Sequence, residues 1–156
     1  MKRIIISAMA ANRVIGGEEG LPWHIPEEYQ HFLNHVKNNV MIMGRKSWQI
    51  FRKDLAQTVA NVIITRSTTI DDALSASSLE EALKIAEAYN RSIYIAGGAA
   101  IYKLALDKNL VDEMYLSYID QTPDGNAFFP EFDESEWQST SQEFKRYRLV
   151  HYQKIN

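Results

Sequence analysis

Short apolar runs alternate with amphipathic stretches along most of the chain. The apolar runs have strand length and lie at residues 4–8, 40–43, 59–65, 92–96 and 113–119. Between them, helical periodicity or helix-start signals appear at about 27–38, from 45 onward, and at about 79–89 and 99–108. Strands that alternate with helices in this way are typical of a parallel sheet. We therefore predict an α/β fold, a single domain over residues 1–156 with a central, mostly parallel sheet and helices on both faces.

The C-terminal part of the chain has a different pattern. An acidic, turn-rich loop is expected over residues 121–136, followed by a last strand near residues 144–155. We predict that this strand is antiparallel, belongs to a C-terminal hairpin and lies at an edge of the sheet. Lys145, Arg146 and Arg148 would then lie on a solvated strand face.

A carboxylate near the start of the 27–38 helix is predicted to point inward. Pro22 and Pro26 make the preceding segment stiff and extended, and Pro26 suits the first position of a helix. Glu28 then lies four residues before Phe32 on the apolar stripe, close to Trp23. A buried carboxylate needs a partner or keeps its proton to unusually high pH. Acids in a first helical turn also complement the helix dipole, so a solvated Glu28 is the alternative.

The histidines and cysteines limit metal and redox chemistry. His31 and His35 share with Glu27 a helix face that we expect to be solvated, and the chain has no HExxH pattern. It also has no cysteine, which excludes disulfides, thiolate metal sites and a cysteine nucleophile. No metal site is expected.

Charge and hydropathy do not favour nucleic acid or membranes as partners. The net charge of −3 leaves no basic footprint. The basic start and the short apolar run after it resemble a signal peptide only loosely, and a buried first strand explains them better. No stretch approaches the roughly 20 apolar residues of a membrane span. We expect a cytoplasmic protein that acts as a monomer.

Glycines, cations and hydroxyls follow three of the predicted strands. The motifs are GRKS at 44–47, TRS at 65–67 and GGA at 97–99. Ligands bind beyond the carboxyl ends of parallel strands, and glycines at helix starts let the backbone approach a phosphate. Neither glycine turn matches GxGxxG or a P-loop. Together with Glu28, these features favour a dinucleotide enzyme over a binding module, and the glycine-rich segment 13–20 is expected to be a flexible lid.

Several motifs resemble those of the dihydrofolate reductase family and occur in that family's order. They are AANRVIG at 10–16, LPWHIPEE at 21–28, VMIMGRKSW at 40–48, AGG at 96–98 with Ile101-Tyr102, and Phe129-Pro130. The resemblance covers nearly the whole chain. It implies the dihydrofolate-reductase-like fold, NADPH as cofactor and 7,8-dihydrofolate as substrate. Hydride would pass to the imine carbon of the dihydropterin while the adjacent nitrogen takes a proton through water.

The resemblance also implies roles for individual residues. Glu28 would pair with the ring amide and the amino group of the pterin, and Ser117 would support Glu28. Trp23 would anchor the water, and Leu21 would lie on the lid. The implied substrate-binding residues are Ile6, Ala8, Glu28, Tyr29, Phe32, Phe51, Leu55 and Ala96. The implied cofactor-binding residues are Ala8, Ile15, Gly44, Arg45, Lys46, Ser47, Thr65, Arg66, Ala96, Gly97, Gly98, Ala99, Ile101 and Tyr102.

The segment before the third strand departs from the family pattern. The family normally has an arginine there that binds the glutamate carboxylate of folate, whereas residues 56–61 contain none and Thr58 or Val59 takes its place. A bidentate contact between arginine and carboxylate is worth about 1.5–3 kcal/mol, so folate is expected to bind roughly 10- to 100-fold more weakly. Lys53 could compensate only as a point charge.

Two further departures concern the substrate tail and the lid. Tyr29 and Phe51 stand where smaller aliphatic residues are common, and Asn126 stands where an aspartate usually braces the lid. One alternative is therefore an NADPH-dependent reductase of a dihydropterin without the glutamate tail, such as dihydromethanopterin. The other is a non-catalytic nucleotide-binding protein of the same fold.

Overall fold

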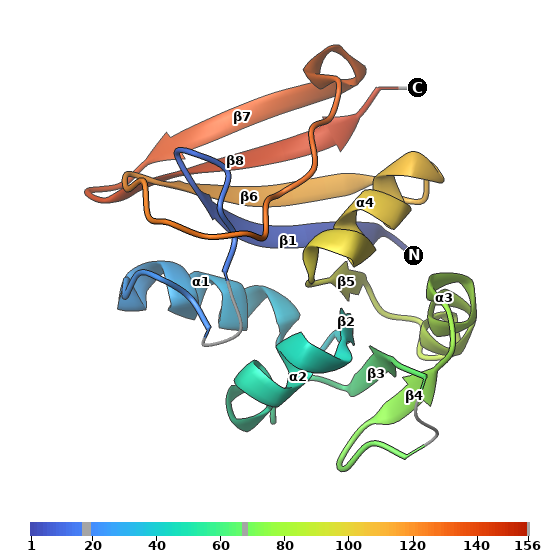
Figure 1. Ribbon diagram of the computed structural model, residues 1–156. Coiled ribbons are helices and arrows are strands. Elements are labelled where there is room, and N and C mark those ends of the chain that lie inside the picture. Colours follow the sequence, from blue (N-terminus) through green and yellow to red (C-terminus); the bar gives the residue numbers. More distant parts are fainter. Residues whose placement is uncertain (17–19, 67–68, 156) are drawn as a thin grey trace.

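In the computed structural model, which describes residues 1–16, 20–66 and 69–155, eight strands form one sheet (Figure 1). The strand order is β4-β3-β2-β5-β1-β6-β8-β7, parallel from β4 to β6 and antiparallel for the last two strands. The strands are β1 (Arg3–Ala10), β2 (Val40–Gly44), β3 (Ala60–Ile64), β4 (Leu74–Ala76), β5 (Ile93–Ile95), β6 (Glu113–Ile119), β7 (Trp137–Glu143) and β8 (Tyr147–Lys154). The helices are α1 (Pro26–Val36), α2 (Arg45–Phe51), α3 (Leu79–Glu87) and α4 (Ala99–Asp107), with short 3-10 turns η1 (Arg52–Asp54) and η2 (Glu134–Glu136).

Both faces of the sheet are covered, which explains why its central strands are apolar throughout. Successive side chains of β1 point to opposite faces. Ile5 packs into a core with Leu79 of α3, whereas Ile4 and Ile6 pack into a second core with Trp48 of α2. The predicted α/β fold with helices on both faces is confirmed.

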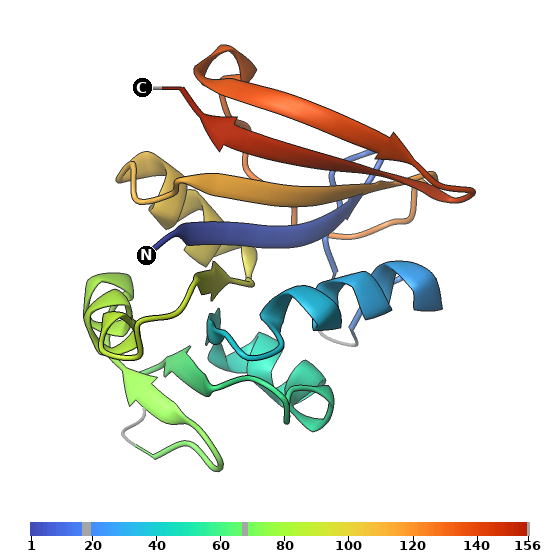
Figure 2. The ribbon, with the colours of Figure 1, turned by 180° about the vertical axis from the view of Figure 1, so that it is seen from behind.

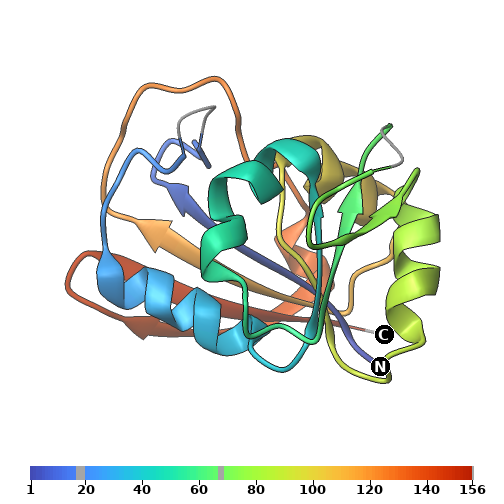
Figure 3. The same cartoon turned by 90° about the horizontal axis from the view of Figure 1, so that it is seen from below.

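Two loops meet at the carboxyl end of the parallel strands, opposite the two termini (Figure 3). Val14 forms an isolated antiparallel bridge with Phe128, and the Ile15 amide donates to the Ala127 carbonyl at 3.0 Å. The segment after β1 is therefore attached to the segment between β6 and β7. Of the predicted lid at 13–20, residues 17–19, including Gly17, lie outside the described residues.

The prediction that the last strand lies at an edge of the sheet is wrong. β8 pairs with β6 on one side and with β7 on the other, so β7 is the edge strand, and the hairpin forms the end of the sheet opposite β4 (Figure 2). The sequence pattern does not predict a strand at the position of β7. Every residue of β7 after Trp137 is polar and exposed, so the alternation of apolar and polar residues that marks a strand is absent. Lys145 and Arg146 lie in the turn before β8, and Arg148 lies over the Tyr118 ring at 5.0 Å.

Helix boundaries follow local capping chemistry. At α3 the Glu81 amide donates to Ser78 Oγ at 3.1 Å, and the Glu81 carboxylate accepts from the Ser77 amide at 3.0 Å. α1 begins at Pro26 as expected but ends at Val36, because Asn38 adopts a positive φ of 63°. In the part of the chain that the structure describes, no helix has both the length and the apolar content needed to cross a membrane.

Candidate active site

A pocket of about 390 Å³ lies at the carboxyl ends of the central strands. β1 lies between β5 and β6 in the sheet, and the pocket wall is formed by residues of β1 and β6 and by the turn that follows β5. Most of the predicted site residues line it: Ile6, Ala8, Ile15, Leu21, Glu28, Tyr29, Phe32, Lys46, Ser47, Phe51, Ala96, Gly97, Gly98, Ala99, Tyr102 and Ser117. Residues from widely separated parts of the sequence therefore share one cavity.

Glu28 is a buried ionisable group in the wall of this pocket. The carboxylate is buried, with 6% of the residue exposed, and Ser117 Oγ donates to Glu28 Oε2 at 3.1 Å. Burial raises the pKa of Glu28 to about 7, although the hydrogen bond from Ser117 lowers it. The inward orientation predicted for Glu28 is confirmed, and the solvated alternative is wrong. A carboxyl group with this pKa exchanges its proton near neutral pH.

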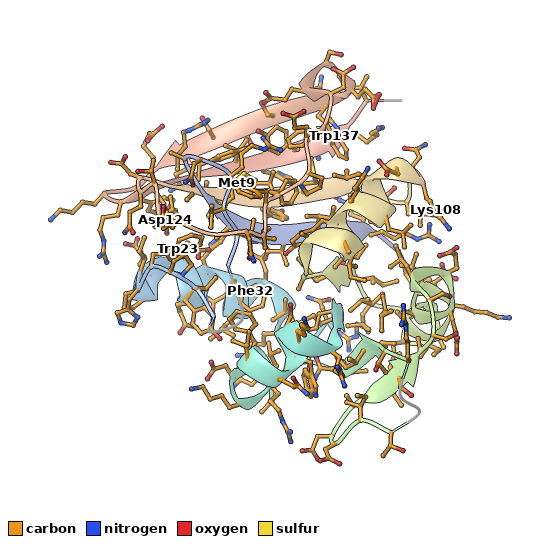
Figure 4. The ribbon with its side chains drawn as sticks, viewed as in Figure 1. Met9, Trp23, Phe32, Lys108, Asp124 and Trp137 are labelled. Atoms are coloured by element: carbon orange, nitrogen blue, oxygen red, sulfur yellow. The ribbon has the colours of Figure 1, made fainter. Side chains whose placement is uncertain are left out.

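Trp23 lies next to the pocket without lining it. Its side chain is buried in a third apolar cluster that contains Ile25 and Tyr147, at the entry to α1 (Figure 4). Among the described residues, Trp23 Nε1 finds no hydrogen-bond partner although it is buried. Buried indole N–H groups normally have an acceptor, so this atom marks a place for an additional polar group.

Three aromatic rings form the wall between α1 and α2. The Tyr29 ring lies 5.9 Å from Phe32 and 6.2 Å from Phe51, measured between centroids, and Phe32 is seen between the two helices in Figure 4. Tyr29 Oη donates to Asp54 Oδ2 at 2.6 Å, and burial is the largest cause of the raised pKa of this tyrosine. Leu55, which was predicted to bind substrate, is instead buried in the core and does not line the pocket.

Glycines bring two strand ends into close contact. The Gly44 amide donates to the Gly97 carbonyl at 2.9 Å, and Tyr102 Oη donates to the Ile6 carbonyl at 2.8 Å. Gly97 has φ of +123°, and a Cβ there would lie 3.4 Å from Ser47 Oγ. The positive φ favours glycine at this position, and the turn packs closely against Ser47 and Tyr102.

Five predicted cofactor-binding residues lie outside the pocket wall. Gly44, Arg45 and Ile101 lie at the starts of α2 and α4, with Arg45 exposed. Thr65 and Arg66 follow β3, where Arg66 is exposed and the Thr65 amide donates to the Ala76 carbonyl. Ser67 of the same motif lies outside the described residues.

Sequence reasoning missed several residues of the pocket wall. The missed residues are Ser7, Gly16, Gly20, His31, Met43, Ile50, Tyr115, Asn126, Ala127 and Leu149. The alternation along β6 could have identified Tyr115, which lies two residues before Ser117 and on the same face. His31 was placed on a solvated face with His35, which is wrong, because both rings are half-buried. A helical wheel gives no sign of the strands that cover this face.

Comparison with known proteins identifies the family and the fold. A family model described as dihydrofolate reductase matches residues 3–153. The chain belongs to the dihydrofolate reductase family. The dihydrofolate reductase of Neisseria gonorrhoeae is 32% identical over 161 residues, which cover 97% of this chain and 98% of that relative. The enzyme of Bacillus subtilis is 32% identical over 140 residues, covering 88% and 81%.

A solved structure supports the same relationship. Dihydrofolate reductase from Enterococcus faecalis, complexed with NADP(H) and RAB-propyl, matches with a TM-score of 0.88 and 25% identity, covering 99% of this chain and 97% of that one. As a member of the dihydrofolate reductase family, the chain is an NADPH-dependent oxidoreductase. The residues present fit this cofactor, because Gly97 and Gly98, the Ser47 hydroxyl and the Lys46 cation all line the same pocket.

Proposed function

We propose that this chain is a dihydrofolate reductase, which reduces 7,8-dihydrofolate to tetrahydrofolate with NADPH. One observation carries the proposal: the buried Glu28 carboxylate, hydrogen-bonded to Ser117, lies in the main pocket of a dihydrofolate reductase fold. The test measures NADPH consumption by the purified chain with and without dihydrofolate, and identifies tetrahydrofolate as the product. If consumption did not depend on dihydrofolate, the proposal would be rejected.

In this proposal Glu28 holds the pterin ring. Its carboxylate accepts hydrogen bonds from the ring amide N–H and from the amino group, which supply the donors that a buried carboxylate needs. Ser117 donates to the Oε2 atom and fixes the orientation of the carboxylate. Phe32 packs on the substrate rings, and Ile6 borders the reacting face, since both line the pocket. Tyr29 and Phe51 border the tail.

The proton is proposed to reach the substrate nitrogen through a water molecule held by Trp23. This assignment rests on Trp23 Nε1, which is buried and lacks a partner among the described residues. Glu28 lies in the adjacent pocket, and its pKa of about 7 lets it exchange the proton at neutral pH. Leu21 closes this side of the pocket and excludes bulk water.

The cofactor is proposed to lie along the strand ends. NADPH supplies the hydride when bound. Ala8 would hold its carboxamide through backbone groups, and Ala96 borders the position of transfer, so that donor ring and pterin meet face to face. The residues proposed to contact the rest of the cofactor are Ile15, Gly44, Arg45, Lys46, Ser47, Thr65, Arg66, Gly97, Gly98, Ala99, Ile101 and Tyr102.

Lys46→Gln is expected to weaken NADPH binding about tenfold, because it removes a charge-assisted contact to phosphate. NADH binding should change much less, since NADH lacks the ribose phosphate. The dissociation constants of both cofactors can be measured by quenching of tryptophan fluorescence. Lys53→Gln is the matched control, because Lys53 is also exposed but does not line the pocket. Equal losses for NADPH and NADH would place Lys46 away from the ribose phosphate.

Residues 56–61, which lead into β3, contain no arginine that could bind the substrate tail. Thr58 Oγ1 donates to the Leu55 carbonyl and lies 2.9 Å from Asn61 Oδ1, whereas Val59 is 42% exposed. Val59→Arg is therefore expected to raise kcat/KM for dihydrofolate about tenfold, by adding a partner for the tail carboxylate. A dihydropterin without the tail should show no change. Val59→Gln, which adds length without charge, is the control, and an equal gain there would contradict the electrostatic explanation.

The nearest rival keeps the chemistry and changes the substrate to a dihydropterin without the glutamate tail. It is favoured by the missing arginine and by the Asp54 carboxylate, which lies 2.6 Å from Tyr29 Oη on the tail side of the pocket. Brisk turnover of such a dihydropterin with negligible turnover of dihydrofolate would establish it. A non-catalytic nucleotide-binding role is the third candidate. It requires that Glu28→Gln leaves every measurable activity and affinity unchanged.

We also infer a monomer of one domain over residues 1–156 that works in the cytoplasm. The lack of cysteine, which excludes disulfides, supports the cytoplasmic setting. Light scattering coupled to size-exclusion chromatography measures the mass in solution, and a dimer mass would contradict the inference.

A further inference from the structure

Two histidines on α1 bring their ring nitrogens together beside the main pocket. His31 Nε2 and His35 Nε2 lie 3.1 Å apart, with ring centroids 4.5 Å apart and planes inclined by 70°. The two residues are one helical turn apart, so the helix backbone fixes their spacing. The reaction proposed above assigns no role to either imidazole.

Neighbouring strands hold the His35 ring in place. Tyr94 Oη of β5 lies 3.2 Å from His35 Nδ1, and the Tyr115 ring of β6 packs 4.2 Å from the His35 ring. Tyr115 in turn stacks on His151 of β8 at 4.2 Å, and His151 Nε2 is 2.6 Å from Glu113 Oε1. These contacts with β5 and β6 fix the orientation of the His35 ring, and its Nε2 atom is directed toward His31.

The hydrogen-bond partners of His35 suit a role as a ligand. A tyrosine hydroxyl both donates and accepts, so Tyr94 can accept from a protonated Nδ1 of His35 and leave the Nε2 lone pair free. In the metal-free protein the two Nε2 atoms share a hydrogen bond, so one of them carries a proton, and metal binding requires that ring to move its proton to Nδ1.

We propose that His31 and His35 form a two-imidazole site for a divalent transition metal ion, of the class Zn²⁺, Ni²⁺ or Cu²⁺. Imidazoles bound to tetrahedral zinc at about 2.0–2.1 Å have nitrogens about 3.3 Å apart, close to the distance found here. Helical histidine pairs of this i, i+4 spacing bind zinc in metalloproteases. Among the described residues no third histidine, aspartate or glutamate joins them, so water completes the coordination.

The site opens toward the main pocket, because His31 is part of the pocket wall. Imidazole favours Cu²⁺, Ni²⁺ and Zn²⁺ over Mg²⁺ or Ca²⁺, which prefer oxygen ligands. Affinity should follow the order Cu²⁺ above Ni²⁺ and Zn²⁺, with no detectable binding of Mg²⁺. The proposal is independent of the reductase activity and of the substrate.

Binding is tested by calorimetric titration of the untagged full chain with ZnCl₂ or CuCl₂, with and without NADPH. We expect one saturable site, lost in His31→Gln and in His35→Gln and retained in the matched control His24→Gln, because His24 is exposed and lies before α1. Tyr94→Phe should weaken binding about tenfold, since it removes the partner that orients His35. The thermal unfolding of each metal-free variant shows whether it is folded.

A second measurement needs no variant. With one equivalent of Cu²⁺, the electron paramagnetic resonance spectrum should show hyperfine coupling to two imidazole nitrogens. Coupling to a single nitrogen or to none would overturn the proposal. So would equal binding by wild type and His31→Gln, or a loss in His24→Gln as large as that in His35→Gln.

Discussion

Glu28→Gln is expected to lower kcat/KM for dihydrofolate by about 10²–10⁴-fold, the range typical of a positioned acid–base group. The amide has nearly the same shape as the carboxylate, but it presents an NH₂ donor where the pterin also offers donors. It also cannot exchange the proton that Glu28 exchanges with its pKa of about 7. Steady-state kinetics with saturating NADPH measure the effect.

The adjacent acid provides a matched control. Glu27 is exposed in the same helical turn, so Glu27→Gln removes the same charge from the same helix end without touching the pocket. Less than a twofold change is expected there, as for a solvated acid near a helix start (about 0.3 kcal/mol). Similar losses in both variants would mean that general electrostatics, rather than contact with substrate, explains the effect of Glu28.

Ligand-free wild type is expected to lose stability relative to Glu28→Gln as pH rises from about 4.5 to about 7. The folded state binds the Glu28 proton more tightly than the unfolded chain, so the stability gained from that proton is complete below pH 4.5 and is lost through pH 7. The shift corresponds to about 3 kcal/mol. Urea denaturation of both proteins at pH 5 and pH 8 measures the difference.

The hydrogen bond to Ser117 supplies an internal check. Because that bond favours the ionised carboxylate, Ser117→Ala should raise the pKa of Glu28 further and extend the pH-dependent loss above pH 7. If the stability difference between wild type and Glu28→Gln were flat from pH 5 to pH 8, the carboxylate would not be buried as described.

Local patterns predicted the parts of the fold that are determined by local chemistry. The apolar runs identified the buried strands, and the phase of the helix after Pro26 separated buried Glu28 from exposed Glu27. The partner of Glu28 could not be derived in this way. Ser117 lies on β6, and only the pairing of β1 with β6 brings that strand to the pocket. The expectation for Ser117 came from family resemblance.

The failures share one cause, which is tertiary contact that the local sequence does not encode. β7 has no apolar alternation, yet it pairs with β8 along its whole length. His31 and His35 lie on the polar stripe of α1, yet the tyrosines of β5 and β6 half-bury that stripe.

The position of β8 has a consequence for synthesis on the ribosome. This strand, which ends at Lys154, pairs with β6 along one edge and with β7 along the other. Until β8 has left the exit tunnel, β6 presents an unpaired edge and β7 has no neighbour in the sheet. The nascent chain therefore cannot complete this half of the sheet before β8 emerges, and until then it offers the exposed strand surface that chaperones bind.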